Sequence, residues 1–189
     1  MNKKDNQRTR LSKMLLKNAM LTLLKEKRTV NKITVRELCT AAELNRSTFY
    51  AHYNEPKDLL DEITAQLLGD IAAYLKEIGE GNDTDAYKAV AKFLKYIRQN
   101  DMEFRTLLVD STDTDFKNQF MQVSVNEIIR SFDISLAADE EQYVYSYILN
   151  GSTNVIMQWI RSGYSVEESK LVELLFRMNK KLLEGVVIG

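Results

Sequence analysis

The sequence predicts an all-α fold of about nine helices, built from 189 residues. Apolar residues recur at steps of three and four over most of the chain, which is the period of an amphipathic helix. One proline and seven glycines are too few for the many tight turns of a β-sandwich. A chain of this length buries roughly 70% of its unfolded surface, so it needs neither disulfides nor a metal to fold.

The N-terminal part of the chain has the pattern of three helices. Residues 8–27 carry apolar side chains at helical spacing and predict the first. Thr34 and Glu37 have the spacing of a capping box, which predicts that a second, short helix starts there. Asn45 is a suitable N-cap for a third helix over 46–52. Two short helices separated by about three residues indicate a helix-turn-helix motif.

The remainder of the chain is predicted to be helical as well. Pro56 occupies the position of a first-turn proline, and the fourth helix is predicted over 56–78, before the glycine-containing segment 79–83. Ser165 is the expected N-cap of the last helix. The later helices are predicted over 84–99, 101–109, 113–132, 139–162 and 166–184.

One segment fits two interpretations. Residues 143–149 are aromatic and β-branched and are followed by Asn150-Gly151, which is the pattern of a strand that enters a hairpin turn. The flanking residues have a helical pattern, and no other segment predicts a strand that would complete a sheet. Because an isolated hairpin is marginally stable, we favour a helix here.

The net charge of −1 conceals two opposed halves. Residues 1–60 contain 13 Lys and Arg against 6 Asp and Glu, a net charge of +7. Residues 61–189 contain 13 against 21, a net charge of −8. Since nucleic-acid-binding domains are usually basic, the split predicts that contact with a polyanion is confined to the N-terminal end.

Several classes of protein are not expected. No apolar run approaches the ~20 residues of a membrane span, and residues 1–5 lack the features of a secretory signal, so a cytoplasmic location is expected. Cys39 is the single cysteine and His52 the single histidine, which predicts neither an internal disulfide nor a zinc site. No cofactor-binding loop and no paired nucleophile and base are present, so an enzyme is not expected. His52 is therefore predicted to contact phosphate or cap a helix rather than to act as a general base.

The third helix is predicted to expose a polar face suited to the major groove of DNA. Arginine bonds guanine edges, serine and threonine hydroxyls reach bases or phosphates, and tyrosine and histidine donate to phosphate oxygens. The N-terminus of the preceding helix also favours a phosphate. These two helices supply Thr34, Arg36, Arg46, Ser47, Thr48, Tyr50 and His52, with Lys3, Lys4, Arg8 and Arg10 as a possible N-terminal arm. The core of the motif is predicted to contain Leu38, Ala41, Leu44, Phe49 and Tyr53, with Cys39 as a small buried residue.

These residues resemble the helix-turn-helix of the TetR family of transcriptional regulators. The resemblance covers about 50 residues, and the phrase Ser-Thr-Phe-Tyr-Ala-His-Tyr at 47–53 is its most specific part. Glu43 stands where the family often has glycine, which predicts a left-handed backbone at a cost of ~1 kcal/mol. Pro56 stands where the family usually has lysine, which shifts the expected phosphate contact to Lys57.

The resemblance implies a homodimer with a DNA-binding domain over 1–55 and an effector-sensing and dimerisation domain over 56–189. It implies a repressor that is released from a palindromic, double-stranded DNA operator by a small-molecule effector, with the helix over 56–78 as the lever. The alternative is a regulator or activator of the same family that is controlled by a partner protein.

The resemblance also implies two sites in the second domain, although a packed helical core explains most of the same residues. An effector pocket is expected to include Phe120, Tyr147 and Trp159. The last two helices are expected to form the dimer interface, through Val155, Ile156, Leu171, Leu174, Leu175, Met178 and Leu182. Trp159 to Gly163 resembles the junction between those two helices.

Overall fold

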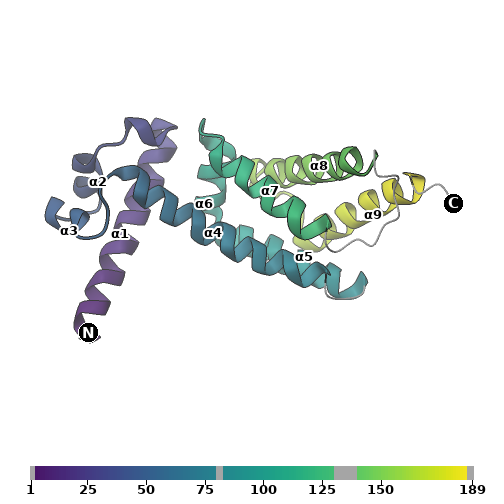
Figure 1. Cartoon of the computed structure of the whole chain (residues 1–189), viewed down its shortest axis with the longest axis horizontal. Helices are drawn as coiled ribbons and strands as arrows, with labels where there is room; N and C mark the ends of the chain where they lie inside the picture. The colour runs from purple at the N-terminus through teal and green to yellow at the C-terminus, as the bar shows by residue number, and fades with distance from the viewer. Residues whose placement is uncertain (1–2, 80–82, 130–139, 187–189) are drawn as a thin grey trace. The chain divides into compact units, whose positions relative to one another are not determined.

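A computed structural model describes residues 3–79, 83–129 and 140–186 and confirms the all-α class (Figure 1). Within these ranges there are nine α-helices and no strand. The N-terminal helices are α1 (Lys3–Lys27), α2 (Val35–Ala41), α3 (Arg46–Tyr50) and α4 (Pro56–Gly79). The later helices are α5 (Asp83–Gln99), α6 (Asp101–Phe104), α7 (Asp115–Ile129), α8 (Glu141–Arg161) and α9 (Glu168–Val186). No helix in the described ranges is both long enough and apolar enough to cross a membrane.

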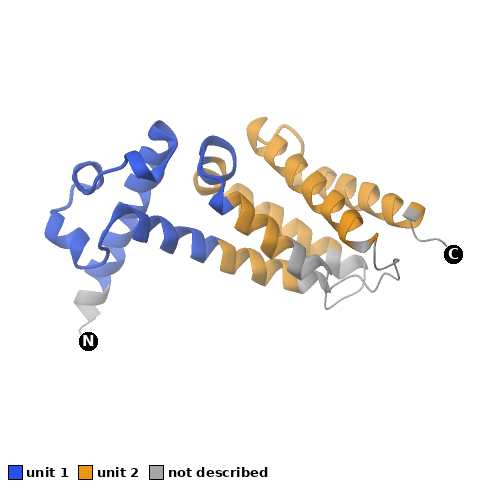
Figure 2. Ribbon diagram, turned by 45° about the horizontal axis from the view of Figure 1, so that its top comes forward, with its two compact units in different colours: residues 1–67, 106–116 blue, residues 68–105, 117–189 orange. Residues whose placement is uncertain are grey.

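The chain divides into two compact units, which are coloured separately in Figure 2. Unit 1 contains residues 1–67 and 106–116, and unit 2 contains residues 68–105 and 117–189. Helix α4 therefore contributes its first half to unit 1 and its second half to unit 2. The predicted functional boundary after residue 55 stays a prediction.

The core of unit 1 is formed by buried side chains of α1 to α4. Leu38 and Phe49 are fully buried and Tyr53 is nearly so, as the sequence predicts. Ala41 was expected in this core but is exposed, and Ala42 is buried instead. The reason is helical geometry, because the residue four positions after Leu38 lies on the same face of the helix. Leu44, also expected there, is half-buried.

The capping box at the start of α2 is confirmed by two hydrogen bonds. The Glu37 N–H donates to Thr34 Oγ1 over 3.3 Å, and the Thr34 N–H donates to Glu37 Oε2 over 3.0 Å. Asn45 occupies the N-cap position of α3, but its side chain makes no cap hydrogen bond. The Asn45 carbonyl alone accepts from the Thr48 and Phe49 N–H groups.

The predicted N-cap of the last helix is wrong. Helix α9 begins at Glu168, three residues after Ser165. The Ser165 hydroxyl instead donates to Ser162 Oγ over 2.9 Å, within the loop that follows α8. The loop is longer than the sequence pattern predicts, and Gly163 and Tyr164 take left-handed backbone conformations within it.

Residues 143–149, for which the sequence allowed a strand or a helix, belong to α8. Tyr145, Ile148 and Leu149 are buried at steps of three and one, which places them on one face of a helix. Tyr143 and Tyr147 lie on the exposed face. The aromatic side chains of the segment are thus divided between the buried and the exposed face of a helix, and they do not alternate as in a strand.

The single helix predicted over 101–109 is divided in the structure. Helix α6 ends at Phe104, and a π-helix follows over Arg105–Asp110. The wider turn is marked by the Ser111 N–H, which donates to the Thr106 carbonyl five residues earlier over 2.8 Å. Three consecutive residues, Thr106 to Leu108, are buried, which the narrow apolar stripe of an amphipathic α-helix does not accommodate.

Candidate nucleic-acid interface

The turn between α2 and α3 is tight and contains a left-handed residue. The Leu44 N–H donates to the Cys39 carbonyl over 2.9 Å, and the Glu43 N–H donates to the Thr40 carbonyl over 3.3 Å. Glu43 has a φ of 54°, the conformation that the sequence predicts at this position. Residues other than glycine adopt it at a cost of about 1 kcal/mol. The turn therefore sets the direction of α3 relative to α2, and its left-handed residue lowers the stability of the fold.

Helix α3 is anchored on one face and open on the other. Phe49 is fully buried, and its ring lies 5.6 Å from that of Tyr53, centroid to centroid. Arg46 and Tyr50 are exposed, and they lie on one side of the helix because they are four positions apart. Of the other residues predicted to contact DNA from α3 and the turn after it, Ser47 is exposed, whereas Thr48 and His52 are half-buried.

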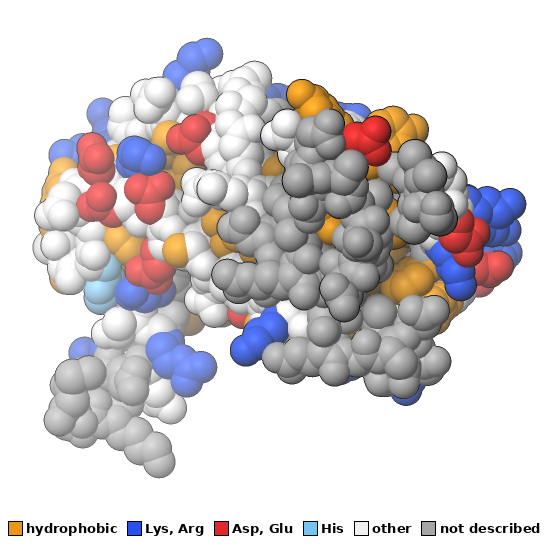
Figure 3. Space-filling model, turned by 45° about the vertical axis from the view of Figure 1, so that its right-hand side comes forward, with side chains coloured by type: hydrophobic (Ala, Val, Ile, Leu, Met, Phe, Trp, Pro, Cys, Tyr) orange, Lys and Arg blue, Asp and Glu red, His pale blue; other side chains and the backbone are white. Residues whose placement is uncertain are grey.

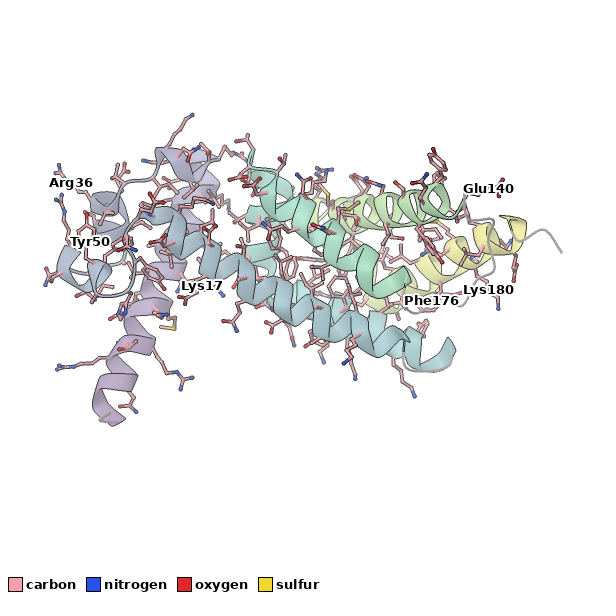
Figure 4. All side chains as sticks on the ribbon, viewed as in Figure 1. Lys17, Arg36, Tyr50, Glu140, Phe176 and Lys180 are labelled. Atoms are coloured by element: carbon pink, nitrogen blue, oxygen red, sulfur yellow. The ribbon has the colours of Figure 1, made fainter. Side chains whose placement is uncertain are left out.

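Helix α2 presents Arg36 on the same outer side. Figure 4 shows Arg36 on α2 and Tyr50 on α3 pointing outward, on the side of the two helices that faces away from α1. The Thr34 hydroxyl is already used within the capping box, because it donates to Glu37 Oε2 over 2.8 Å. Arg36 is thus the more available of the two residues predicted at this end of α2.

A surface hollow of about 310 Å³ lies between α2 and α3. It brings together Arg36 and Arg46, the two guanidinium groups that the sequence assigns to DNA. The hollow is lined by Arg36, Cys39, Thr40, Glu43, Leu44, Asn45 and Arg46. Burial raises the pKa of the Cys39 thiol, which keeps it in the protonated, weakly reactive form.

Sequence reasoning missed Asn45 as a candidate contact. The sequence predicts it as a helix cap, yet its side chain makes no cap hydrogen bond and lines the hollow next to Arg46. Residues at the start of a recognition helix are the ones that reach base edges, and asparagine pairs with adenine. The position of Asn45 directly before α3 is compatible with either role, and the sequence pattern favours the N-cap.

The remaining cations of unit 1 differ in their partners. Lys57 is exposed and forms an ion pair with Asp61 over 3.1 Å, and this carboxylate raises the pKa of Lys57. Lys13 forms an ion pair with Glu62 over 2.8 Å and lies 5.5 Å from the centre of the Tyr53 ring. The expected N-terminal arm is instead the first part of α1, where Arg8 and Arg10 are exposed.

The three residues predicted to line an effector pocket have different surroundings in unit 2. Phe120 is buried and stacks on Phe93 with 6.2 Å between ring centres. Trp159 is buried, and its indole N–H donates to the Val166 carbonyl over 2.7 Å. Tyr147 is 69% exposed on α8 and does not share an enclosed lining with the other two. The pocket assignment stays a prediction.

The residues predicted at the dimer interface divide between the two sides of α8 and α9. Ile156, Leu171 and Leu175 are buried within the single chain. Met178 is 43% exposed, and Val155, Leu174 and Leu182 are half-buried. Hydrophobic side chains reach the surface at several places on the face shown in Figure 3. In the described ranges, no group of three or more His, Cys, Asp or Glu residues is placed to hold a metal ion.

Solved structures of transcriptional regulators share this fold. A TetR transcriptional regulator from Streptococcus agalactiae 2603V has a TM-score of 0.69 at 24% identity, over 93% of this chain and 97% of that one. The fatty acid degradation regulator FadR from Bacillus halodurans has a TM-score of 0.64 at 16% identity, over 94% and 97%. The dihydroxyacetone kinase operon activator DhaS has a TM-score of 0.58 at 15% identity, over 93% and 97%. At these identities the likeness is one of fold.

Two comparisons of the sequence gave different results. The search of curated protein sequences found no match. A family model, TetR_C_8, described as "Transcriptional regulator C-terminal region", matches residues 84–181, which is more than half of the chain. The match lies entirely outside the helix-turn-helix, so it is independent of the residues that suggested the family at the N-terminus. The chain belongs to the TetR family of transcriptional regulators.

Proposed function

We propose that the chain binds a palindromic DNA operator as a homodimer and acts as a repressor that a small-molecule effector releases. The observation that carries the DNA-binding part is the geometry of α3. Phe49 anchors this helix in the core, while Arg46, Ser47 and Tyr50 are exposed to solvent. Such a helix presents a continuous polar face to a major groove.

The residues of this face have separate roles in the proposal. Arg46 bonds the O6 and N7 atoms of guanine, the commonest specific contact of an arginine. Arg36, on the same hollow, binds a backbone phosphate and sets the orientation of the motif. The supporting contacts come from Thr34, Ser47, Thr48, Tyr50, His52 and Lys57.

The homodimer supplies the second reading head. Two recognition helices related by a two-fold axis reach successive major grooves about 34 Å apart, which requires a near-palindromic operator. The exposed apolar side chains of α8 and α9 support this assembly, since Tyr143 is 70% and Met178 43% exposed in the single chain. Burying them against a symmetry mate is favourable in free energy.

Control by an effector is a population shift between two forms of the dimer. In one form the spacing of the two recognition helices matches the operator, and in the other it does not. Helix α4 is the proposed lever because it is one continuous helix from Pro56 to Gly79. Leu59 and Ile63 bury its first half in unit 1, and Ile71 and Leu75 bury its second half in unit 2. A tilt of α4 therefore moves the DNA-binding helices.

A partner protein is the second candidate signal. Phe120 and Trp159 are packed against other aromatic rings, and Tyr147 points to the surface. Filled surroundings at these positions favour a signal that is read at the surface. This alternative would be supported if no candidate small molecule changed the affinity for the operator and a partner protein did change it.

The test of DNA binding is selection of random duplex DNA with the purified chain, followed by affinity measurements on the selected site. We expect a palindrome, and we expect Arg46→Ala to weaken binding by about 1–3 kcal/mol if Arg46 reads a base. Lys95→Ala removes another exposed cation, from α5 in unit 2, and should leave the affinity unchanged. Equal affinities of Arg46→Ala and the wild type would show that the assigned reading face is wrong.

A further inference from the structure

Two distant parts of the sequence meet at the C-terminal end of α1. Residues 106–116 belong to unit 1, although they follow a long stretch of unit 2, and they are drawn in the colour of unit 1 in Figure 2. They reach the unit through Arg28, the residue directly after α1. Arg28 has a φ of 68°, so the chain turns there and its carbonyl leaves the hydrogen-bond pattern of the helix.

The carbonyl oxygen of Arg28 is the centre of this contact. It accepts hydrogen bonds from the Thr112 N–H over 2.9 Å, from Thr112 Oγ1 over 3.0 Å and from Ser111 Oγ over 3.2 Å. The guanidinium group of Arg28 donates to the Asp110 carbonyl over 2.8 Å and approaches Asp110 Oδ1 at 3.3 Å. One residue therefore holds the whole segment from Asp110 to Thr112.

The neighbouring residue continues the connection to α2. The Lys27 ammonium donates to Glu37 Oε1 over 2.5 Å and to the Lys32 carbonyl over 2.9 Å. Glu37 in turn accepts from the N–H and hydroxyl of Thr34 through its other oxygen. Hydrogen bonds and one peptide link thus run without a gap from Asp110–Thr112 through Arg28, Lys27 and Glu37.

Helix α2 depends on such connections for its position. It has only seven residues, and an isolated helix of that length is not stable in water. Its first turn carries Arg36, which is exposed and makes part of the hollow beside α3. A displacement of the first turn of α2 therefore displaces the Arg36 guanidinium on the surface assigned to DNA.

We propose that Arg28 is a positioning residue through which residues 106–116 hold α2, and with it Arg36, in the place where DNA is contacted. The inference rests on the proposed function and adds a route of control that does not pass through α4. The segment follows α6, contains most of the π-helix and ends in the first residues of α7. A rearrangement of either flank is therefore transmitted to the Arg28 contact by the chain itself.

The first test compares two threonines on the full-length chain. Thr112→Val removes a hydroxyl that bonds the Arg28 carbonyl, whereas Thr22→Val removes a hydroxyl that bonds the Asn18 carbonyl within α1. We expect Thr112→Val to weaken binding to the selected operator by about 2- to 10-fold, the equivalent of one hydrogen bond. Thr22→Val should stay within about twofold of the wild type. Equal affinities of the two variants would overturn the inference.

The second test separates positioning from simple charge effects. Asp110→Ala removes a negative charge from the unit that carries the DNA-contacting face, so electrostatics alone predicts tighter binding to DNA. The positioning role predicts the opposite, a loss of about 2- to 10-fold, because the Arg28 side chain loses its carboxylate partner. Unchanged or tighter binding of Asp110→Ala would contradict the proposal.

Hydrogen exchange makes the inference independent of DNA. In Thr112→Val we expect faster exchange of the amides of 35–41 than in Thr22→Val, with no change at the start of α4. Faster exchange confined to 106–116, or raised equally throughout unit 1, would refute a specific connection to α2. If the wild type selects no DNA site, the proposed function fails, while this exchange measurement still decides whether the two segments are coupled.

Discussion

Three residues other than glycine take left-handed backbone conformations in the described ranges. They are Arg28 with a φ of 68°, Glu43 with 54° and Tyr164 with 62°. Each follows the end of a helix, where this conformation is common but usually filled by glycine. Glu43 was recognisable from the sequence because the resembling family often has glycine there. Arg28 and Tyr164 carry no such signal in the sequence, although each contacts a distant residue: Arg28 bonds Asp110, and Tyr164 bonds Asp101.

Glu43 gives a direct measure of this strain. Glu43→Gly removes the Cβ that disfavours the left-handed conformation, whereas Glu43→Ala removes the carboxylate and keeps the Cβ. We expect the glycine variant to be more stable than the alanine variant by roughly 0.5–1 kcal/mol, once the greater freedom of glycine in the unfolded chain is included. Urea unfolding of the two variants measures the difference. An alanine variant as stable as the glycine variant would show that the turn is unstrained.

Glu37 predicts a pH dependence with a definite sign. The hydrogen bond from Lys27, with those from Thr34, lowers the pKa of Glu37 from 4.5 to about 2. Because the folded-state pKa lies below the unfolded value, its contribution to stability is complete above about pH 4.5 and is lost as the pH falls towards 2.

Thermal melts across pH test this contribution. The melting temperature of the wild type should exceed that of Glu37→Gln at pH 6, and the gap should close as the pH approaches 2. Glutamine is a suitable control because it can keep the capping box while losing the charge. A gap that stays constant with pH would exclude an ionised Glu37 as its source.

At the level of elements, local signals in the sequence were the reliable ones. The capping box located the start of α2, and Pro56 located the start of α4, because each acts within one turn of helix. The π-helix over 105–110 was not predictable, since its burial pattern depends on packing rather than on local preference. The N-cap role of Ser165 failed for a similar reason, because the loop that precedes α9 is longer than its pattern indicates.

Helix α9 has two faces that are expected to respond differently to substitution. Leu175 is buried within unit 2, so Leu175→Ala should lower the free energy of unfolding by about 2–5 kcal/mol.

Met178 is 43% exposed in the single chain, so Met178→Glu should leave the fold of each chain intact and disfavour the proposed dimer. Light scattering at micromolar concentration should report a monomer for Met178→Glu and a dimer for the wild type. A wild type that is monomeric at that concentration would argue against the dimer itself.

At the scale of the whole molecule, the charge is divided as the proposed contact with DNA requires. A total of −1 combines +7 over residues 1–60 with −8 over the rest. The sequence was sufficient to assign this division, as well as the fold class and the exposed face of α3. It did not predict that residues 106–116 join the N-terminal unit, because a contact between Arg28 and Asp110–Thr112, about 80 positions apart, leaves no periodic pattern in the sequence.

The charge distribution predicts steep salt dependence despite the nearly neutral total. Each phosphate neutralised by a cation changes the slope of log K against log salt by about −0.9. Arg36→Ala should therefore make the slope shallower by about one, while Lys95→Ala should not alter it. Affinities measured on the selected operator over a range of salt concentrations give the slopes. Identical slopes for Arg36→Ala and the wild type would show that Arg36 does not contact a phosphate.

The buried indole of Trp159 determines what optical measurements on this protein report. It is the single tryptophan of the chain, and it is held at the connection between α8 and α9 by its bond to the Val166 carbonyl. Selectively excited fluorescence therefore follows unit 2 and does not sense α2 and α3, the helices proposed to contact DNA. A fluorescence unfolding curve describes unit 2 alone, whereas circular dichroism averages over both units. If the two units unfold separately, the two signals will not coincide, and their difference will isolate the stability of unit 1.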